Sequence, residues 1–153
     1  MKKVLLVAVL TAFAVPALAG SVAEKKKHDA VEESLAKSAA KVKDCGKTFK
    51  FVYDWKAFDA LPFKEPKEKE RDSRFGSEIS NVEHIGDGLN KLCEDKDYKA
   101  AMSKIDTVIY KPVGDDKIKV KATISGSTLT YENYTFGSTR DRDDYMKAAK
   151  AAL

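Results

Sequence analysis

Two cysteines are the residues whose chemistry is easiest to assign in this sequence. The chain has 153 residues, and Cys45 and Cys93 are its only cysteines. A pair of thiols can form a disulfide, bind a metal or exchange electrons, but the sequence has neither a Cys-x-x-Cys spacing nor a Cys/His cluster. We therefore predict a structural disulfide between Cys45 and Cys93, which should stabilise the fold by ~4 kcal/mol in the chain-entropy model.

His84 is the candidate for acid–base chemistry. It follows Glu83 in an amphipathic segment, and a small hydrolytic enzyme could use it together with a carboxylate such as Glu83 or Asp87. Such a site also needs a nucleophile and a group that orients the histidine, and the sequence identifies neither. The sequence therefore favours a protein that is not an enzyme and has no catalytic residues, with a hydrolase using His84 as an alternative.

The acidic clusters do not have the pattern of a metal site. Asp115 and Asp116 occupy a predicted turn, and the acidic residues of 141–144 stand at the start of a predicted helix, where carboxylates stabilise the positive end. Neither cluster has the spacing of a calcium-binding loop. The sequence also lacks a glycine-rich phosphate loop and the motifs Gly-x-Ser-x-Gly and His-Glu-x-x-His. We therefore expect no metal and no cofactor.

The N-terminus resembles a bacterial secretory signal peptide in composition. A basic start precedes an apolar run over 4–15, and the sequence Ala17-Leu18-Ala19 follows as a small-x-small cleavage site. The run is too short for a membrane span, which needs ~20 apolar residues. The sequence therefore predicts a signal peptide over 1–19 with cleavage between Ala19 and Gly20. It also predicts a single exported α+β domain over 20–153, located in the periplasm or secreted, with no stable membrane insertion after cleavage.

The charge of the chain argues against a nucleic-acid partner. The net charge is +4 at pH 7, and two of these charges come from Lys2 and Lys3 in the predicted signal peptide. Charges of both signs are interspersed in the rest of the chain, without a cationic face that carries aromatic residues. We therefore expect the partner to be another envelope or extracellular protein.

The stretch from Ser77 to Ile105 organises the predicted fold. Its apolar residues recur every three or four positions, which predicts a helix with one buried stripe: Ile79, Val82, Ile85, Leu89 and Leu92. Gly86 and Gly88 are unusual here, because each glycine inside a helix costs roughly 1 kcal/mol relative to alanine. We expect another backbone to approach closely at these glycines, or the helix to bend.

The charged run from Lys64 to Arg74 comes before this helix. It has no apolar residue apart from Pro66, so burial cannot offset the entropy cost of ordering it. We predict a solvated loop there. A mobile lid or a docking segment is the alternative interpretation.

Alternating residues predict the strands. Four aromatics share one face of a strand over 48–55, and a strand over 117–124 alternates lysine or threonine with apolar residues. Strands over 107–110 and 128–136 complete the set, the second with a bulge or bend expected near Asn133. With helices over 23–42 and 138–153, the order predicts an α+β fold. We expect a four-stranded, mainly antiparallel sheet with helices packed on one face, and one disulfide.

The solvent side of this sheet and its hairpin turn form the candidate interaction surface. The surface consists of Lys117, Lys119, Lys121, Ser125 and Gly126. The leading hypothesis is a small exported binding or interaction protein, without catalytic activity, whose ligand the sequence does not identify. An immunity-type protein and a purely structural envelope protein are further alternatives.

Ser125-Gly126 followed by Tyr131 resembles part of a loop in the periplasmic lysozyme inhibitors. That family carries Ser-Gly-x-x-Tyr, and here the tyrosine stands two positions farther along. The resemblance implies a polar loop that inserts into the cleft of a lysozyme. The same Ser-Gly pair is also typical of a tight hairpin turn. A lysozyme-inhibitor-like protein is therefore an alternative within the binding hypothesis.

Overall fold

The computed structural model describes residues 22–153. The elements follow in the order α1 (Val22–Lys41), β1 (Lys50–Tyr53), α2 (Trp55–Asp59), α3 (Lys67–Leu92), α4 (Lys96–Met102), β2 (Thr107–Val113), β3 (Val120–Ser125), β4 (Thr128–Tyr134) and α5 (Arg142–Ala152). These helices and strands have the α+β composition that the sequence predicts. The predicted signal peptide over 1–19 and its cleavage site lie outside the described residues.

The four strands form one mixed sheet in the order β1-β2-β4-β3. β1 pairs with β2 in parallel, β2 pairs with β4 in parallel, and the β3–β4 hairpin is antiparallel. The prediction of a mainly antiparallel sheet is therefore wrong, because β2 and β3 follow each other in the chain without pairing. The loop over 114–119 carries the chain past an open position to the outer edge of the sheet, and β4 then fills that position.

The strand order agrees with what each strand can bury. β3 exposes alternate residues, among them Lys121, as expected of an edge strand whose charge discourages further pairing. β4 lies inside the sheet and has Leu129 and Tyr131 fully buried. Pro112 lies within β2, although proline is normally confined to strand edges. It is tolerated because β1 pairs with β2 only as far as Tyr110, so Pro112 has a neighbouring strand on one side.

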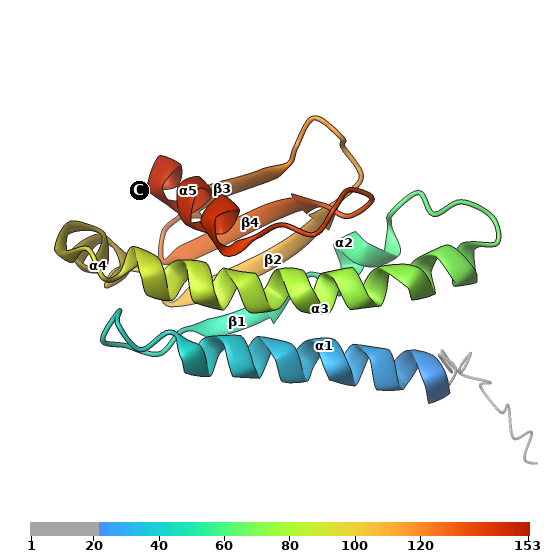
Figure 1. The fold of residues 1–153 in the computed structure, drawn as a ribbon, viewed down its shortest axis with the longest axis horizontal. Coiled ribbons are helices and arrows are strands. Elements are labelled where there is room, and N and C mark those ends of the chain that lie inside the picture. Colours follow the sequence, from blue (N-terminus) through green and yellow to red (C-terminus); the bar gives the residue numbers. More distant parts are fainter. Residues whose placement is uncertain (1–21) are drawn as a thin grey trace, which may run out of the picture.

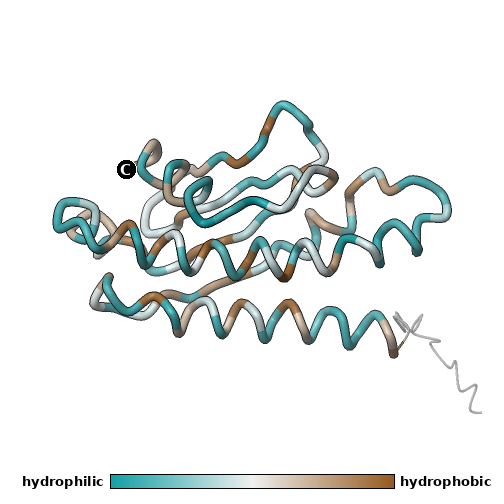
Figure 2. The backbone as a smooth tube through the Cα atoms, in the orientation of Figure 1, coloured by the Kyte–Doolittle hydropathy of each residue, from teal (hydrophilic) through white to brown (hydrophobic). Residues whose placement is uncertain are grey.

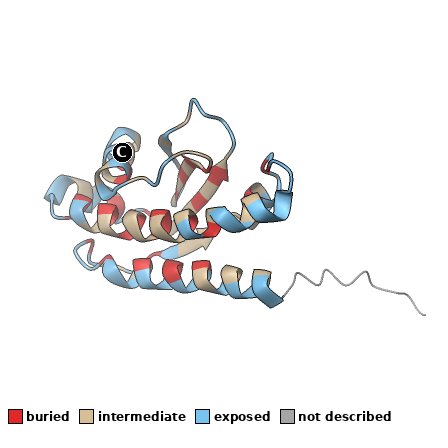
Figure 3. Ribbon diagram, turned by 45° about the vertical axis from the view of Figure 1, so that its right-hand side comes forward, coloured by how far each residue is buried: buried red, intermediate tan, exposed pale blue. Residues whose placement is uncertain are grey.

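α1, α3 and α5 form one layer over a single face of the sheet (Figure 1). Burial in the strands follows this arrangement: Val108, Tyr110, Leu129 and Tyr131 face the helices and are buried, whereas the residues between them are half-buried. Hydrophobic and hydrophilic residues alternate in bands along α1 and α3 (Figure 2). The buried residues of α1 and α3 lie where the helices face each other and the sheet, while the outer side of α1 is exposed (Figure 3).

α3 begins at Lys67, well before Ser77. The solvated loop predicted over Lys64 to Arg74 is therefore wrong for most of its length, because this run supplies the first turns of the helix. Arg71 illustrates why the run is ordered: its Nη2 lies 2.9 Å from Glu24 Oε1 and 2.6 Å from Asp59 Oδ1. Its guanidinium also lies 5.2 Å from the ring centroid of Phe58. Long cationic side chains can cover apolar surface while their charges stay solvated, so a run without aliphatic residues can still pack.

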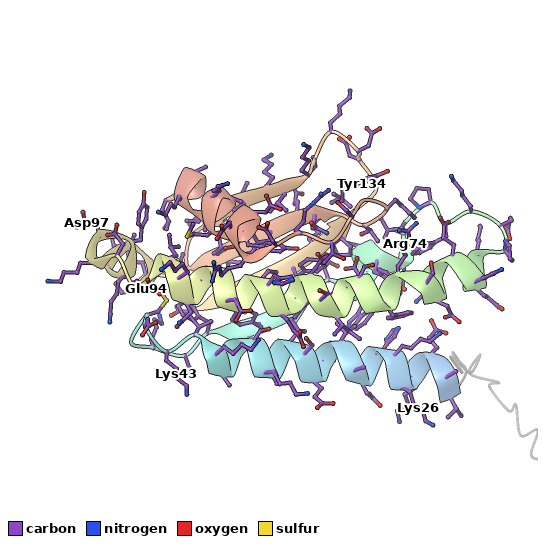
Figure 4. All side chains as sticks on the ribbon, viewed as in Figure 1. Lys26, Lys43, Arg74, Glu94, Asp97 and Tyr134 are labelled. Carbon is purple, nitrogen blue, oxygen red and sulfur yellow. A yellow bond between two sulfur atoms is a disulfide. The ribbon has the colours of Figure 1, made fainter. Side chains whose placement is uncertain are left out.

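The predicted disulfide between Cys45 and Cys93 is confirmed. The two Cα atoms are 4.9 Å apart, and both residues are buried. Cys45 lies in the turn after α1 and Cys93 follows the last residue of α3, so the bond joins the C-terminal ends of two neighbouring helices, close to Lys43 and Glu94 (Figure 4). The cysteines are 48 residues apart in sequence. A loop of that length corresponds to ~4 kcal/mol of stability in the chain-entropy model.

Glycine allows α3 to approach both of its neighbouring helices closely. A Cβ atom at Gly86 would lie 2.8 Å from the carbonyl oxygen of Ser38 on α1, and one at Gly88 would lie 2.8 Å from the carbonyl oxygen of Arg142 on α5. Both oxygens belong to the backbone, which cannot swing away as the end of a long side chain could. The predicted close approach is confirmed, and it explains why glycine is present at these two positions despite its poor helix propensity.

Replacing Gly88 by alanine should lower the free energy of unfolding by about 2 kcal/mol or more, because the added methyl group must push α5 away from α3. Gly76 provides a matched control in the same helix, since a Cβ atom there would meet nothing within 4 Å. Gly76→Ala should raise stability by up to ~1 kcal/mol through helix propensity. Chemical denaturation measures both changes, and equal effects of the two substitutions would refute the role given to Gly88.

Candidate functional site

The structure places Lys121, Ser125 and Gly126 along one edge of the open sheet face. Lys121 and Ser125 are exposed residues of β3 whose side chains lie on the face away from the helices. Gly126 is exposed in the turn to β4 and has a φ of 57°, a conformation that glycine adopts without strain. These three residues therefore belong to one accessible surface.

The other two predicted surface residues lie elsewhere. β3 begins at Val120, so Lys117 and Lys119 precede the strand and do not continue a stripe along it. The backbone N–H of Lys117 donates to Asp115 Oδ1 at 3.0 Å within the preceding turn. Lys119 lines a pocket beside α5. The predicted lysine stripe is thus divided between a turn, a pocket and the sheet face.

No helix within residues 22–153 covers the second face of the sheet. Its middle row crosses all four strands as Val52, Ile109, Thr130 and Thr123, side by side in the pairing register. In this row Thr123 is exposed and the other three side chains are half-buried. A row of β-branched side chains on a pleated sheet gives a flat surface that a partner could bury without displacing any of the helices described above.

The charged residues of this face have a positive balance. Lys111 Nζ lies 2.9 Å from Glu132 Oε1, and Lys121 stands opposite Glu132 in the next strand. Lys50 adds an exposed cation on β1. Three lysines therefore accompany one glutamate in the strands of this face.

His84 lines a pocket of about 670 Å³ between α3, the end of α1 and the start of α5. The other lining residues are Lys41, Asp87, Asn90, Lys91, Glu94, Asp141, Arg142 and Asp143. The structure thus brings together His84 and Asp87, two residues of the predicted hydrolase set, while Glu83 is not part of the lining. No serine, threonine or cysteine lines this pocket, and no hydrogen bond joins His84 to Asp87 within the described residues. The lining therefore has a candidate base, but no hydroxyl or thiol nucleophile and no hydrogen bond that orients the histidine through Asp87.

The cations of the His84 pocket are paired with neighbouring carboxylates. Lys41 Nζ lies 3.4 Å from Asp87 Oδ1, Lys91 Nζ lies 2.5 Å from Glu94 Oε2, and Arg142 Nε lies 3.3 Å from Asp143 Oδ1. Such pairing leaves little net field to attract a charged ligand.

A buried carboxylate on α3 forms the centre of a polar network inside the core. Glu78 is fully buried, and its Oε2 accepts a hydrogen bond from the Tyr53 hydroxyl at 2.8 Å. Nearby, the Tyr110 hydroxyl accepts from Asn81 Nδ2 at 3.3 Å and from Asn133 Nδ2 at 2.9 Å. These side chains come from α3, β1, β2 and β4, so the network spans the interface between the helix layer and the sheet.

Burial raises the pKa of Glu78 to about 7, because the ionised carboxylate loses its hydration. The hydroxyls of Tyr53, Tyr110 and Thr135 and the charge of Arg74 act in the opposite direction. Glu78 Oε1 has no hydrogen-bond partner among the described residues, so the lost hydration is only partly replaced. Burial and the neighbouring carboxylate also raise the pKa of Tyr53 and Tyr110, which keeps both phenols protonated.

Arg74 lies one turn before Glu78 on α3, at the end of the molecule where Tyr134 also lies (Figure 4). The guanidinium of Arg74 stands 5.3 Å from the ring centroid of Phe136 and 3.6 Å from Glu70. Because Glu78 has no exposed surface, its carboxylate cannot contact a substrate in this conformation. We therefore interpret the network as part of the core rather than as a catalytic site.

The buried position of Glu78 was not predicted, although the sequence contains a signal for it. Phe75, Glu78, Val82 and Ile85 recur at intervals of three and four, and all of them are buried. The predicted stripe instead began with Ile79, which is only partly buried. A charged residue within an otherwise apolar stripe was the available clue.

The same network explains a second difference from prediction. No bulge interrupts β4 near Asn133, whose pairing continues in register to Tyr134. Asn133 and Thr135 are buried on the helix-covered face together with Leu129 and Tyr131. The alternation of apolar residues breaks off after Tyr131 because the buried positions at this end of the strand are occupied by the polar residues Asn133 and Thr135.

Of the motif compared with lysozyme inhibitors, only Ser125 and Gly126 are exposed, at the turn between β3 and β4. Tyr131, the tyrosine of the compared motif, is fully buried and packs edge-on against Tyr145, with 5.4 Å between ring centroids. It cannot reach an enzyme cleft alongside Ser125 and Gly126.

Within residues 22–153, no group of three or more His, Cys, Asp or Glu side chains is placed to hold a metal ion. In the same part of the chain, no helix combines the length and hydropathy needed to cross a bilayer. No protein-family model, no curated protein and no solved structure matches the chain.

The raised pKa of Glu78 makes stability depend on pH. The folded protein binds this proton more tightly than the unfolded chain, so the stabilising effect is complete below about pH 4.5 and is lost as the pH rises to about 7. Glu78→Gln keeps the shape of the protonated side chain and removes the titration. At pH 8 the variant should exceed the wild type in unfolding free energy by ~3 kcal/mol, and at pH 4.5 the two should be similar.

Urea unfolding of both proteins at a series of pH values measures this difference. Titrations common to the two proteins cancel when the curves are subtracted. A difference that stays constant between pH 4.5 and 8 would contradict the raised pKa.

Proposed function

We propose that the protein is a small exported binding protein, without catalytic activity of its own, that contacts a protein partner through the open face of its sheet. The observation that carries this proposal is that α1, α3 and α5 all pack on one face, leaving the row from Val52 to Thr123 without helical cover within residues 22–153. The core is complete without that face, which is therefore available for binding.

The chemistry of the face indicates the kind of partner. β-branched side chains supply apolar contact area, and the excess of lysine over glutamate favours a partner with an acidic surface. Lys121 is exposed at the edge of this surface, where a charge mainly affects the rate of association. The partner would lie flat on the sheet, because the β-branched side chains of its middle row form a flat surface.

Two features support a location outside the cytoplasm. The disulfide between Cys45 and Cys93 is typical of oxidising compartments. The N-terminal sequence has the pattern of a secretory signal peptide. Both features favour a partner in the cell envelope or outside the cell.

Site-specific photocrosslinking in the producing organism tests the proposed surface. A photoreactive phenylalanine derivative in place of Thr123, which is exposed on the open face, should give an adduct of defined mass. The same group in place of Lys37, on the outer side of α1, is the matched control and should give none. Lys121→Glu should reduce the yield at position 123, whereas Lys37→Glu should leave it unchanged.

Two outcomes would overturn this proposal. One is the absence of any adduct from position 123 under conditions in which the variant is folded and abundant. The other is an equal yield from positions 123 and 37.

A small hydrolase using His84 is the second candidate, because His84 and Asp87 line the same pocket. This candidate requires that hydrolysis of a chromogenic ester such as p-nitrophenyl acetate depend on His84. Under the binding proposal, the wild type and His84→Gln should hydrolyse it at the same rate. A rate that falls in the variant at unchanged stability would favour the hydrolase.

A further inference from the structure

A second pocket lies between α5 and the segment that leads into β3. It has a volume of about 450 Å³ and is lined by Lys119, Val120, Arg140, Asp144, Lys147 and Ala148. Three cations from three parts of the chain thus surround one small space: Lys119 from the loop before β3, Arg140 from the loop before α5, and Lys147 from α5 itself. Asp144 is the only carboxylate in the lining.

The cations of this pocket are not paired. Within residues 22–153, no carboxylate oxygen lies within 4.0 Å of the charged nitrogens of Lys119, Arg140 or Lys147, whereas all three cations of the His84 pocket have such a partner. Unpaired cations around a concave surface concentrate a positive field, which attracts anions and raises their local concentration.

The protein holds Arg140 in place by its backbone. The N–H of Arg140 donates to Asn81 Oδ1 at 2.9 Å, which attaches this loop to α3. The guanidinium donates to Ser138 Oγ through Nη1 at 3.2 Å, and its buried Nε–H has no acceptor among the described residues. The Arg140 guanidinium therefore keeps N–H donors that are not used within the described residues, and its backbone is already held in place.

Asp144 is engaged by the backbone at the start of α5. Its Oδ2 accepts from the N–H of Asp141 at 3.4 Å, and its own N–H donates to Asp141 Oδ1 at 3.0 Å, which together form a capping box. The carboxylate thus has a role in capping the helix, and the lining keeps an excess of two positive charges.

We propose that this pocket binds a phosphoryl group. A phosphoryl group carries about two negative charges at neutral pH and presents three terminal oxygens. The three terminal oxygens match the three cations that line the pocket from three parts of the chain, whereas a single carboxylate has only two oxygens. Guanidinium and ammonium groups both bind phosphate, the first through a fork and the second as a point charge. This site is separate from the sheet face proposed to bind a protein, so either proposal can fail alone.

Inorganic phosphate, added at constant ionic strength and pH 7.5, is the probe for this site. In two-dimensional amide NMR spectra, the signals of Val120 and Ala148 should shift in a saturable way. Lys119→Ala combined with Lys147→Ala should weaken the apparent affinity by about tenfold or more, since each cation supplies a charge-assisted hydrogen bond. Lys41→Ala combined with Lys91→Ala removes the same charge from the His84 pocket and should change the affinity less than twofold.

Three outcomes would overturn the proposal. The signals of Val120 and Ala148 could fail to shift, the two double variants could lose affinity equally, or succinate could bind as tightly as phosphate.

Thermal unfolding of each variant checks that the fold is kept. Arg140→Gln provides a third variant that retains the backbone bond to Asn81. It should weaken phosphate binding as the double lysine variant does.

Vesicles then distinguish the two sources of a phosphoryl group. Retention on vesicles that contain phosphatidic acid, but not on phosphatidylcholine alone, and its loss in the Lys119/Lys147 variant would indicate a lipid headgroup. Phosphate binding without vesicle retention would indicate a soluble phosphate or phosphate ester.

Discussion

The close contact of α3 with both neighbouring helices is the constraint on which the rest of this structure depends. At Gly86 and Gly88 the helix meets the backbone of α1 on one side and of α5 on the other, with no room for a side chain. The position of α5 sets the walls of both pockets described above, since each is lined in part by residues at its start. The disulfide adds a covalent restraint at the end of the same layer, where α1 and α3 finish together.

The polar network around Glu78 restricts how α3 can be positioned on the sheet. Apolar contacts between a helix and a sheet tolerate small sliding movements. The hydrogen bond that Glu78 accepts from Tyr53 and the one that Asn81 donates to Tyr110 are satisfied in one register. A buried carboxylate contributes little to stability by itself, because desolvation opposes its hydrogen bonds. We interpret its role as fixing the position of α3 along the sheet.

Local patterns in the sequence predicted the elements better than their arrangement. The cysteine pair, the central helix and the close contacts at its glycines were identified because each depends on residue type and spacing. Sheet topology was missed, because pairing depends on which strands exclude water, and the chain order of β2, β3 and β4 suggested a simple meander. Lys121 was interpreted together with Lys117 and Lys119 as part of a binding stripe, although the edge position of β3 alone explains an exposed lysine there.

The candidate sites were predictable only in part, for a related reason. Lys119 was singled out, but Arg140 and Lys147 were not, because they are distant in sequence and meet it only through the packing of α5 against β3. The start of α3 was missed because Arg71 and its neighbours pack through long polar side chains, which hydrophobic periodicity does not detect.

The position of β4 has a consequence for how the chain reaches its native state. β4 pairs with strands on both sides, yet it follows the other three strands of this sheet in the chain, so it is synthesised after them. Until it arrives, β2 and β3 have no partner between them, and the middle of the sheet stays unfilled. The sheet of the nascent chain therefore stays incomplete until β4 is present, a state with exposed apolar segments that are prone to aggregation.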